Sequence, residues 1–252
     1  MNIEGIAVTK MLTRAPFWTQ IAADAVSVHP PRQKIVTLTK PIRRVRKKTA
    51  YHHGDLRRAL TDAAVRVVES HGAGAVTLRE VARMAGVSHQ APYRHFANRS
   101  ELLAAVAEEG FRALYAEMVK AMHAAPDAVS AFRAAGISYV VFAVDHPAHF
   151  RVMFGAEAAA CHRKVPSLAA AGDTLFGVLT KGIGDVKRAI PTEHDVLDIA
   201  LAAWSLVHGL ASLLVEGQLQ GHVYAERTPR ELAELVTRTM KLGFGAANPS
   251  QR

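Results

Sequence analysis

Two short runs of polar side chains offer chemistry, Ser88-His89-Gln90 and Tyr93-Arg94-His95. A glutamine amide can form two hydrogen bonds with the edge of an adenine, and serine or histidine can each form one hydrogen bond with a base. Tyrosine and histidine side chains a few residues further on can reach phosphate oxygens. The chemistry that these residues indicate is therefore hydrogen-bonded recognition of nucleic acid.

The surrounding residues predict a helix-turn-helix over Thr77–Phe96 that would position these side chains. Thr77-Leu-Arg-Glu80 has the pattern of a capping box, in which the threonine hydroxyl accepts the third amide and the glutamate reaches back to the cap amide. The helix that it opens places the small Ala82 where two helices must approach closely. Gly86 lies at the turn, because a positive φ is nearly free only for glycine, and Val87 then fills the corner between the helices.

The second helix of this unit is predicted to begin at Ser88, which caps it, so that its first turn presents His89 and Gln90 outward. Pro92 lies at the edge of that turn and can shift the helix start by one residue, while Phe96 packs back on the core. In such a motif the second helix enters the major groove. A helical hairpin with a glycine turn is common, and the combination with the capping box, the serine cap and the polar turn favours DNA binding. The predicted DNA-contacting residues are Thr77, Arg79, Ser88, His89, Gln90, Tyr93, Arg94, His95 and Arg99. Thr77, Tyr93, His95 and Arg99 are expected on the phosphate backbone.

The rest of the chain predicts an all-α protein with about nine helices and no strand. A first helix begins near Asp55 and ends at Gly72, and Asn98-Arg-Ser-Glu101 opens a longer one that runs to about Met122. A further helix spans Ala128–Val144. Thr192-Glu-His-Asp195 and Thr228-Pro-Arg-Glu231 are predicted to open the helices Val196–Glu216 and Leu232–Phe244.

The positive charge is concentrated in the first 50 residues. These hold ten of the 31 Lys and Arg residues but two of the 22 acids, so residues 51–252 are nearly neutral within a net charge of +9. With Pro30-Pro31 and no sustained period, residues 1–50 are interpreted as a flexible basic arm. Its densest cluster, Lys40–Lys48, could neutralise phosphates or enter the minor groove. The alternatives are a solvated disordered tail and a mis-assigned start codon.

Cysteine content and hydropathy favour an intracellular soluble protein. The single cysteine, Cys161, excludes an internal disulfide, which fits a reducing cytosol, so a cytoplasmic location is expected. The most apolar segment, Val196–Val215, is long enough to cross a bilayer. A buried helix is the preferred interpretation because the carboxylate of Asp198 would be costly in lipid, and no membrane partner is expected.

The second half of the chain is interpreted as a domain for sensing a small molecule and for dimerisation. Its candidate cavity residues are Phe142, Phe150, Met153, Phe154, Trp204 and His208. Such residues are more often core, and His208 could simply be a satisfied buried histidine. Cys161 and five histidines of this half could suit zinc or copper as ligands, but no tight ligand box is present, so no metal and no cofactor are predicted (His146, His149, His162, His194 and His208).

Two other classes of protein, an enzyme and an interaction adaptor, fit these residues less well. The chain has no nucleophile elbow, phosphate-binding glycine loop or His-Glu-x-x-His motif, so no catalytic residue is predicted. Asp145 and His146 are an acid and a base, but adjacent residues point apart on a helix. An adaptor would lack sequence-specific affinity for DNA.

Several motifs resemble the tetracycline-repressor (TetR) family of bacterial regulators. The likeness is carried by Tyr51-His-His-Gly-Asp-Leu56, by the motif at Thr77–Phe96 and by Asn98-Arg-Ser-Glu-Leu-Leu103. Downstream, His146–Phe154 and Trp204-Ser-Leu-Val-His-Gly-Leu-Ala211 resemble the C-terminal domain of the branch with a Trp-x-x-x-His-Gly signature. Residues 1–50 have no counterpart in the family pattern.

The resemblance implies a three-helix DNA-binding domain over residues 51–111 and a helical sensing and dimerisation domain over residues 112–252. It implies a homodimer that binds palindromic double-stranded operators, usually as a repressor, and releases them when a small-molecule inducer enters the C-terminal domain. It also implies a four-helix dimer interface built from the last two long helices of each subunit. The two helices predicted there, from Val196 and from Leu232, are apolar over more than one face, which fits burial against a partner.

Overall fold

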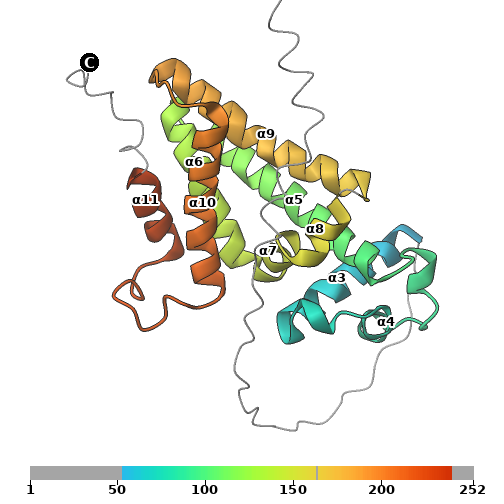
Figure 1. Ribbon diagram of the computed structural model, residues 1–252. Coiled ribbons are helices and arrows are strands. Elements are labelled where there is room, and N and C mark those ends of the chain that lie inside the picture. Colours follow the sequence, from blue (N-terminus) through green and yellow to red (C-terminus); the bar gives the residue numbers. More distant parts are fainter. Residues whose placement is uncertain (1–52, 163, 240–252) are drawn as a thin grey trace, which may run out of the picture.

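A computed structural model describes residues 53–162 and 164–239, and the described part is all-α, as predicted. The predicted arm, residues 1–50, and the end of the last predicted helix lie outside the described residues. Nine α-helices and two 3-10 helices, η2 and η3, follow one another, with no strand among the described residues (Figure 1). The helices are α3 (His53–His71), α4 (Leu78–Ala85), α5 (Arg99–His123), α6 (Ala128–Asp145), α7 (Pro147–Met153), α8 (Ala156–His162), α9 (Pro166–Ala189), α10 (Val196–Val215) and α11 (Pro229–Thr239).

A small N-terminal unit is formed by α3, α4 and the start of α5, with η2 (Ala73–Ala75) and η3 (Pro92–Arg94) between them. Its core is made of apolar residues spaced three or four apart on each helix, the periodicity of a helix with one buried face. Leu60, Val67 and Val81 are fully or almost fully buried, and Phe96 packs among them as predicted. This core holds α4 and the segment that follows it in place, with their outer sides directed away from the molecule.

Helix α5 connects this unit to the larger C-terminal bundle (Figure 1). Leu102 near its start is buried with the N-terminal unit, and Met118 near its end belongs to the same continuous core beside α6 and α9. The predicted domain boundary at residue 111 falls inside this helix. A rigid element therefore runs from the N-terminal unit into the C-terminal bundle, where α6 packs against α9, α10 and α11.

Two helices, α6 and α10, are long and apolar enough to cross a membrane by length and composition. Core helices of water-soluble proteins meet the same criterion. Here α10 packs against α6 and α9, and it contributes Trp204, Val207 and Leu210 to the core. One face of the segment Val196–Val215 is therefore buried within the protein.

Side-chain caps are formed at the starts of three helices, α5, α6 and α11. The side chains of Asn98 and Asp127 accept hydrogen bonds from the amides of Glu101 and Ser130 at 3.0 and 2.8 Å. At α11 the capping box is complete, since the Thr228 hydroxyl accepts from the Glu231 amide and the Glu231 carboxylate accepts from the Thr228 amide at 2.7 Å. A side-chain cap of this kind contributes about 0.5–2 kcal/mol.

Candidate functional site

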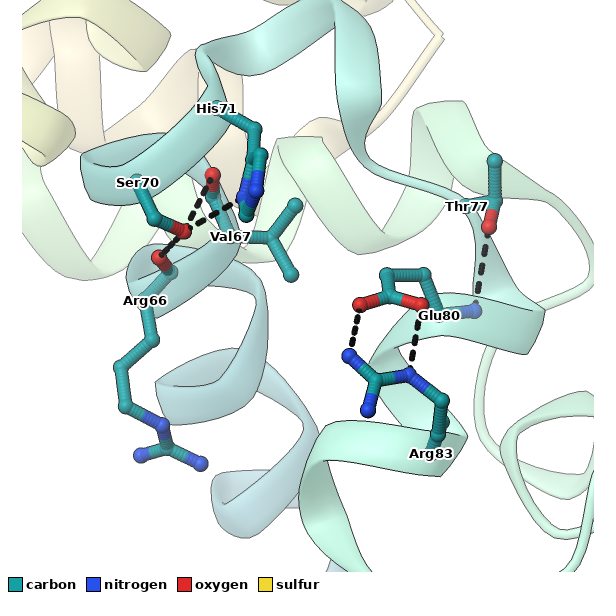
Figure 2. Close-up of polar contacts among 7 residues, drawn as sticks. All are labelled: Arg66, Val67, Ser70, His71, Thr77, Glu80 and Arg83. Atoms are coloured by element: carbon teal, nitrogen blue, oxygen red, sulfur yellow. Dashed lines mark hydrogen bonds and ion pairs between the residues drawn. The ribbon is translucent and has the colours of Figure 1, made fainter. Parts of the chain in front are cut away.

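The first helix of the predicted helix-turn-helix, α4, begins with half of the predicted capping box. The Thr77 hydroxyl accepts the amide hydrogen of Glu80 at 3.1 Å, as predicted (Figure 2). The return bond from Glu80 is not formed, because its carboxylate is paired with the Arg83 guanidinium one turn on, at 2.9 and 2.5 Å. The Arg83 hydrogen bond is the main cause that lowers the pKa of Glu80. The prediction of a reciprocal box at Thr77 is therefore wrong, and α4 holds an internal ion pair instead.

Gly86 makes the sharp turn after α4. Its backbone has φ 70° and ψ 29°, the left-handed conformation that glycine adopts without steric cost. A Cβ at this position would have open space around it, so the backbone conformation rather than packing requires glycine. The amide of Val87 then donates to the carbonyl of Ala82 at 3.0 Å, which closes the helix end and directs the chain outward.

The segment after the turn, Val87–Phe96, differs from the predicted second helix. The Ala91 amide donates to the Ser88 carbonyl at 3.0 Å in a turn, and η3 follows at Pro92–Arg94. Proline has no amide hydrogen, so Pro92 cannot bond to the Ser88 carbonyl as a residue of an α-helix would. Within the described residues the Ser88 side chain makes no capping bond, so the predicted serine cap is wrong. We call Val87–Phe96 the recognition segment.

Most of the predicted DNA-contacting residues lie on the outside of the recognition segment or of α4. Ser88, His89 and Gln90 are all exposed, and the side chain of Tyr93 is 56% exposed. Thr77, Arg79 and Arg94 are exposed as well, while His95 is half-buried. The opening turn of the segment is thus free to lie against a duplex, held from behind by the buried residues Pro92 and Phe96.

Arg99 is placed differently from the other predicted contacts. Its guanidinium donates to the carbonyls of Val76 and Ala73 at 2.8 Å, and it pairs with the Glu157 carboxylate of α8 at 3.1 Å. These bonds join the chain just before α4 to the C-terminal bundle. The structure gives Arg99 a positioning role, and its contact with DNA stays a prediction.

A cavity of about 250 Å³ lies in the C-terminal bundle between α5, α6, α9, α10 and α11. Its wall is largely apolar, with side chains such as Met118, Phe132, Leu175, Leu179 and Val207, and it also holds Arg133, Tyr139 and Thr237. Of the six predicted cavity residues only Trp204 lines it. Arg133 was not among the predicted cavity residues, although it is the single charged residue in the run Ala131–Val144.

The other predicted cavity residues form an aromatic cluster beside the cavity. Phe142 of α6 and Phe150 and Met153 of α7 are buried in the core, where α7 packs against α5 and α6. The His208 ring lies 4.8 Å from the Phe154 ring and 5.3 Å from the Phe150 ring, measured between centroids. The cluster supports the wall without facing the open space.

His208 and Tyr139 link this cluster to the cavity. The Tyr139 hydroxyl and His208 Nδ1 are 2.8 Å apart, and Tyr139 lines the cavity while being almost fully buried. Burial lowers the pKa of His208 to about 4, so the ring is neutral near pH 7. A neutral Nδ1 can accept the tyrosine hydrogen, and the pair is satisfied without any added charge.

Among the described residues, the other predicted candidate ligands do not come together in a metal site. The His146 and His149 ring centroids are 6.1 Å apart, and the Cys161 thiol is directed to the Ser100 carbonyl at 3.8 Å. Within residues 53–162 and 164–239, no group of three or more histidine, cysteine, aspartate or glutamate side chains could hold a metal ion. Burial lowers the pKa of His149 and His162, which is the effect of an apolar environment on a cation.

Comparison with protein-family models matches both halves of the chain. Residues 60–106 match the model of bacterial regulatory proteins of the tetR family, and residues 132–240 match that of a tetracyclin repressor-like C-terminal domain. The two matches fall on the two structural units described above. The chain belongs to the TetR family of bacterial regulatory proteins.

Relatives of known sequence or structure agree with this assignment. The transcriptional regulator BetI of Rhizobium meliloti (strain 1021) is 42% identical over 69 residues, which are 27% of this chain and 34% of BetI. The match therefore spans about a third of that relative's length.

Solved structures of similar proteins extend the likeness to most of the chain. A Rhodococcus protein of unknown function is 32% identical, with a TM-score of 0.64 over 78% of this chain and 98% of its own. A TetR-family protein from Rhodococcus RHA1 shares the fold, with 23% identity and a TM-score of 0.59 over 76% of this chain and 98% of its own. This TetR-family chain is a DNA-binding transcriptional regulator.

Proposed function

We propose that this regulator is a repressor that binds a palindromic operator as a homodimer and releases it when a small molecule occupies the cavity. The observation that carries the proposal is the exposure of Ser88, His89 and Gln90 on a segment fixed from behind by Phe96 and by the Gly86 turn. Three polar side chains at such a position can read base edges in the major groove. The exposed side chains of Tyr93 and Arg94 are suited to phosphate contacts that set the register.

Replacement of Gln90 by alanine is expected to weaken operator binding about 10- to 100-fold, because a bidentate contact with adenine contributes about 1–3 kcal/mol. The operator is first located by footprinting the region upstream of the regulator's own gene. Affinity is then measured by fluorescence anisotropy at fixed salt. Gln218→Ala, at an exposed glutamine after α10, is the matched control and should bind like the unaltered protein. Equal affinity of Gln90→Ala and the control would contradict the proposed readout, and no footprint at all would favour an adaptor.

The basic arm is proposed to add phosphate contacts, although it lies outside the described residues. Deleting residues 1–49 is expected to make log affinity fall less steeply with log salt, by about 0.9 for each phosphate contact that is lost. Operator titrations across a range of salt concentrations measure this slope. An unchanged slope would leave the arm as a solvated tail or as sequence outside the natural start.

The surface proposed for dimerisation is the outward face of α10. Leu201 and Leu213 are 44% and 39% exposed on this face, and the small residues Ala202, Ser205 and Gly209 lie exposed between them. Small side chains in the middle allow two helices to approach closely, and leucines at both ends add apolar area to bury. Symmetric pairing of this face would match the two half-sites of a palindrome.

Ligand binding is proposed to release the operator through a displacement that is transmitted along α5 and through Arg99. Met118 lines the cavity near one end of α5, and Arg99 at the other end bonds to the carbonyls just before α4 and to Glu157 of α8. A ligand that displaces α5 or α8 would thereby change the angle at which α4 and the recognition segment meet DNA. A small molecule that occupies the cavity and leaves operator affinity unchanged would contradict this step.

A further inference from the structure

One charged side chain in an apolar cavity wall points to the chemistry of the ligand. Arg133 is the single charged residue among those that line the cavity in the described part of the chain, and most of its neighbours there are apolar. Guanidinium groups stay protonated at every pH of interest. A site of this composition selects a molecule with an apolar body and one negative charge.

The protein leaves part of this guanidinium unmatched. Arg133 Nε is buried and makes no hydrogen bond with any described residue, and no described carboxylate forms an ion pair with Arg133. Asp127 interacts with it electrostatically, but both Asp127 carboxylate oxygens already bond to Ser130 at 2.8 Å. A buried donor without an acceptor is costly, so a ligand that supplies the acceptor gains affinity from this position.

The balance of charge distinguishes between kinds of anion. A carboxylate carries one charge and matches the planar fork of a guanidinium. A phosphate monoester carries nearly two charges, and the second would be buried in this cavity without a partner. The volume of about 250 Å³ lies below the range of about 300–1,000 Å³ that is usual for drug-sized ligands, so the molecule is compact.

We propose that the cavity binds a small apolar monocarboxylate whose carboxylate accepts hydrogen bonds from Arg133. The proposal rests on the proposed function, in which the cavity is the inducer site. It adds the class of inducer and the residue that recognises the charge. The hydroxyl of Tyr139, on the same helix as Arg133 and also in the wall, is held by its bond to His208 and keeps a fixed orientation.

Titration calorimetry with the full-length protein tests the class of ligand. The probes are octanoate and 3-phenylpropionate, each compared with its primary amide, which has the same shape without the charge. We expect at least one acid to bind about tenfold or more tightly than its amide, as for hydrogen bonds to a charged group. Absence of binding by both acids, or equal binding of each acid and its amide, would overturn the proposal.

Three variants assign the preference to Arg133. Arg133→Met should abolish the preference for the acid, whereas Arg133→Lys, which keeps the charge, should retain part of it. Arg112→Met is the matched control, since Arg112 is 69% exposed on α5 and paired with Glu108, and it should keep the full preference. Circular dichroism melts establish that each variant is folded. A preference that survives in folded Arg133→Met, or that is lost equally in Arg133→Lys, would overturn the role of Arg133.

A parallel operator titration separates this proposal from the function on which it rests. If an acid binds with the expected dependence on Arg133 and operator affinity does not change, the anion site stands and the inducer role is wrong. If the amides release the operator as well as the acids do, the inducer role stands and the preference for an anion is wrong.

Discussion

Replacing Leu201 by glutamate is expected to convert the proposed dimer into monomers and to weaken operator binding by about a hundredfold or more. Leu201 is 44% exposed on the outward face of α10, so the substitution costs little within one protomer. Across a two-fold axis the same face meets its own copy, and two carboxylates would be buried together without a partner. Loss of the second half-site then removes the gain in effective concentration that bivalent binding gives.

Sedimentation velocity measures the oligomeric state in this experiment, and fluorescence anisotropy measures the affinity. Tyr115→Glu, at a tyrosine 37% exposed on α5, is a matched control that should remain dimeric and bind the operator normally. Ser205→Arg, in the middle of the same face of α10, should reproduce the effect of Leu201→Glu with a charge of the opposite sign. A Leu201→Glu protein that still sediments as a dimer would show that subunits pair through another surface.

Lowering the pH from 7 to 4.5 is expected to reduce the free energy of unfolding by about 2–3 kcal/mol through His208 alone. Burial lowers the pKa of His208 to about 4 in the folded protein, against about 6.5 in the unfolded chain. Between these two values the unfolded state takes up a proton that the folded state does not, so stability falls as the pH falls. The contribution is fully present above pH 6.5 and is lost progressively toward pH 4.

Urea unfolding at several pH values, in the unaltered protein and in His208→Gln, measures this contribution. Glutamine can still accept the Tyr139 hydrogen bond but does not titrate. The stability of the His208→Gln protein should therefore fall less steeply as the pH is lowered. His149 and His162, whose pKa values are also lowered by burial, contribute equally to both curves and cancel in the difference. His123→Gln, at an exposed histidine that ends α5, is the control. Parallel curves for the unaltered protein and His208→Gln would contradict the buried, neutral state of His208.

Short-range features of the fold could be predicted because neighbouring residues decide them. Gly86 adopts the positive φ that was predicted, since the chain must turn there and no other residue does so freely. The side chain of Asn98 caps α5 as predicted, because its partner is the amide three residues on. The helix that begins at Val196 was predicted from the apolar residues spaced three and four apart along α10.

Two predictions of local structure were wrong, because a short sequence pattern does not decide between nearby hydrogen-bond partners. The Glu80 carboxylate had two partners within reach, the Thr77 amide and the Arg83 guanidinium, and the pattern of a capping box does not say which one is preferred. At the recognition segment, the effect of Pro92 on the Ser88 carbonyl depends on hydrogen bonds that a linear sequence pattern does not show.

The sequence by itself determined the helical fold, the first helix and the glycine turn of the predicted motif, and the polar residues at its exposed turn, because these depend on contacts within a few residues. Only the tertiary structure decided that Arg99 bonds to Val76, Ala73 and Glu157, and that Arg133 lines a cavity between five helices. It also decided that most of the predicted cavity residues form a core cluster around His208. An arginine side chain is long and amphipathic, so the helices packed around it determine whether it meets solvent, a carbonyl or a cavity.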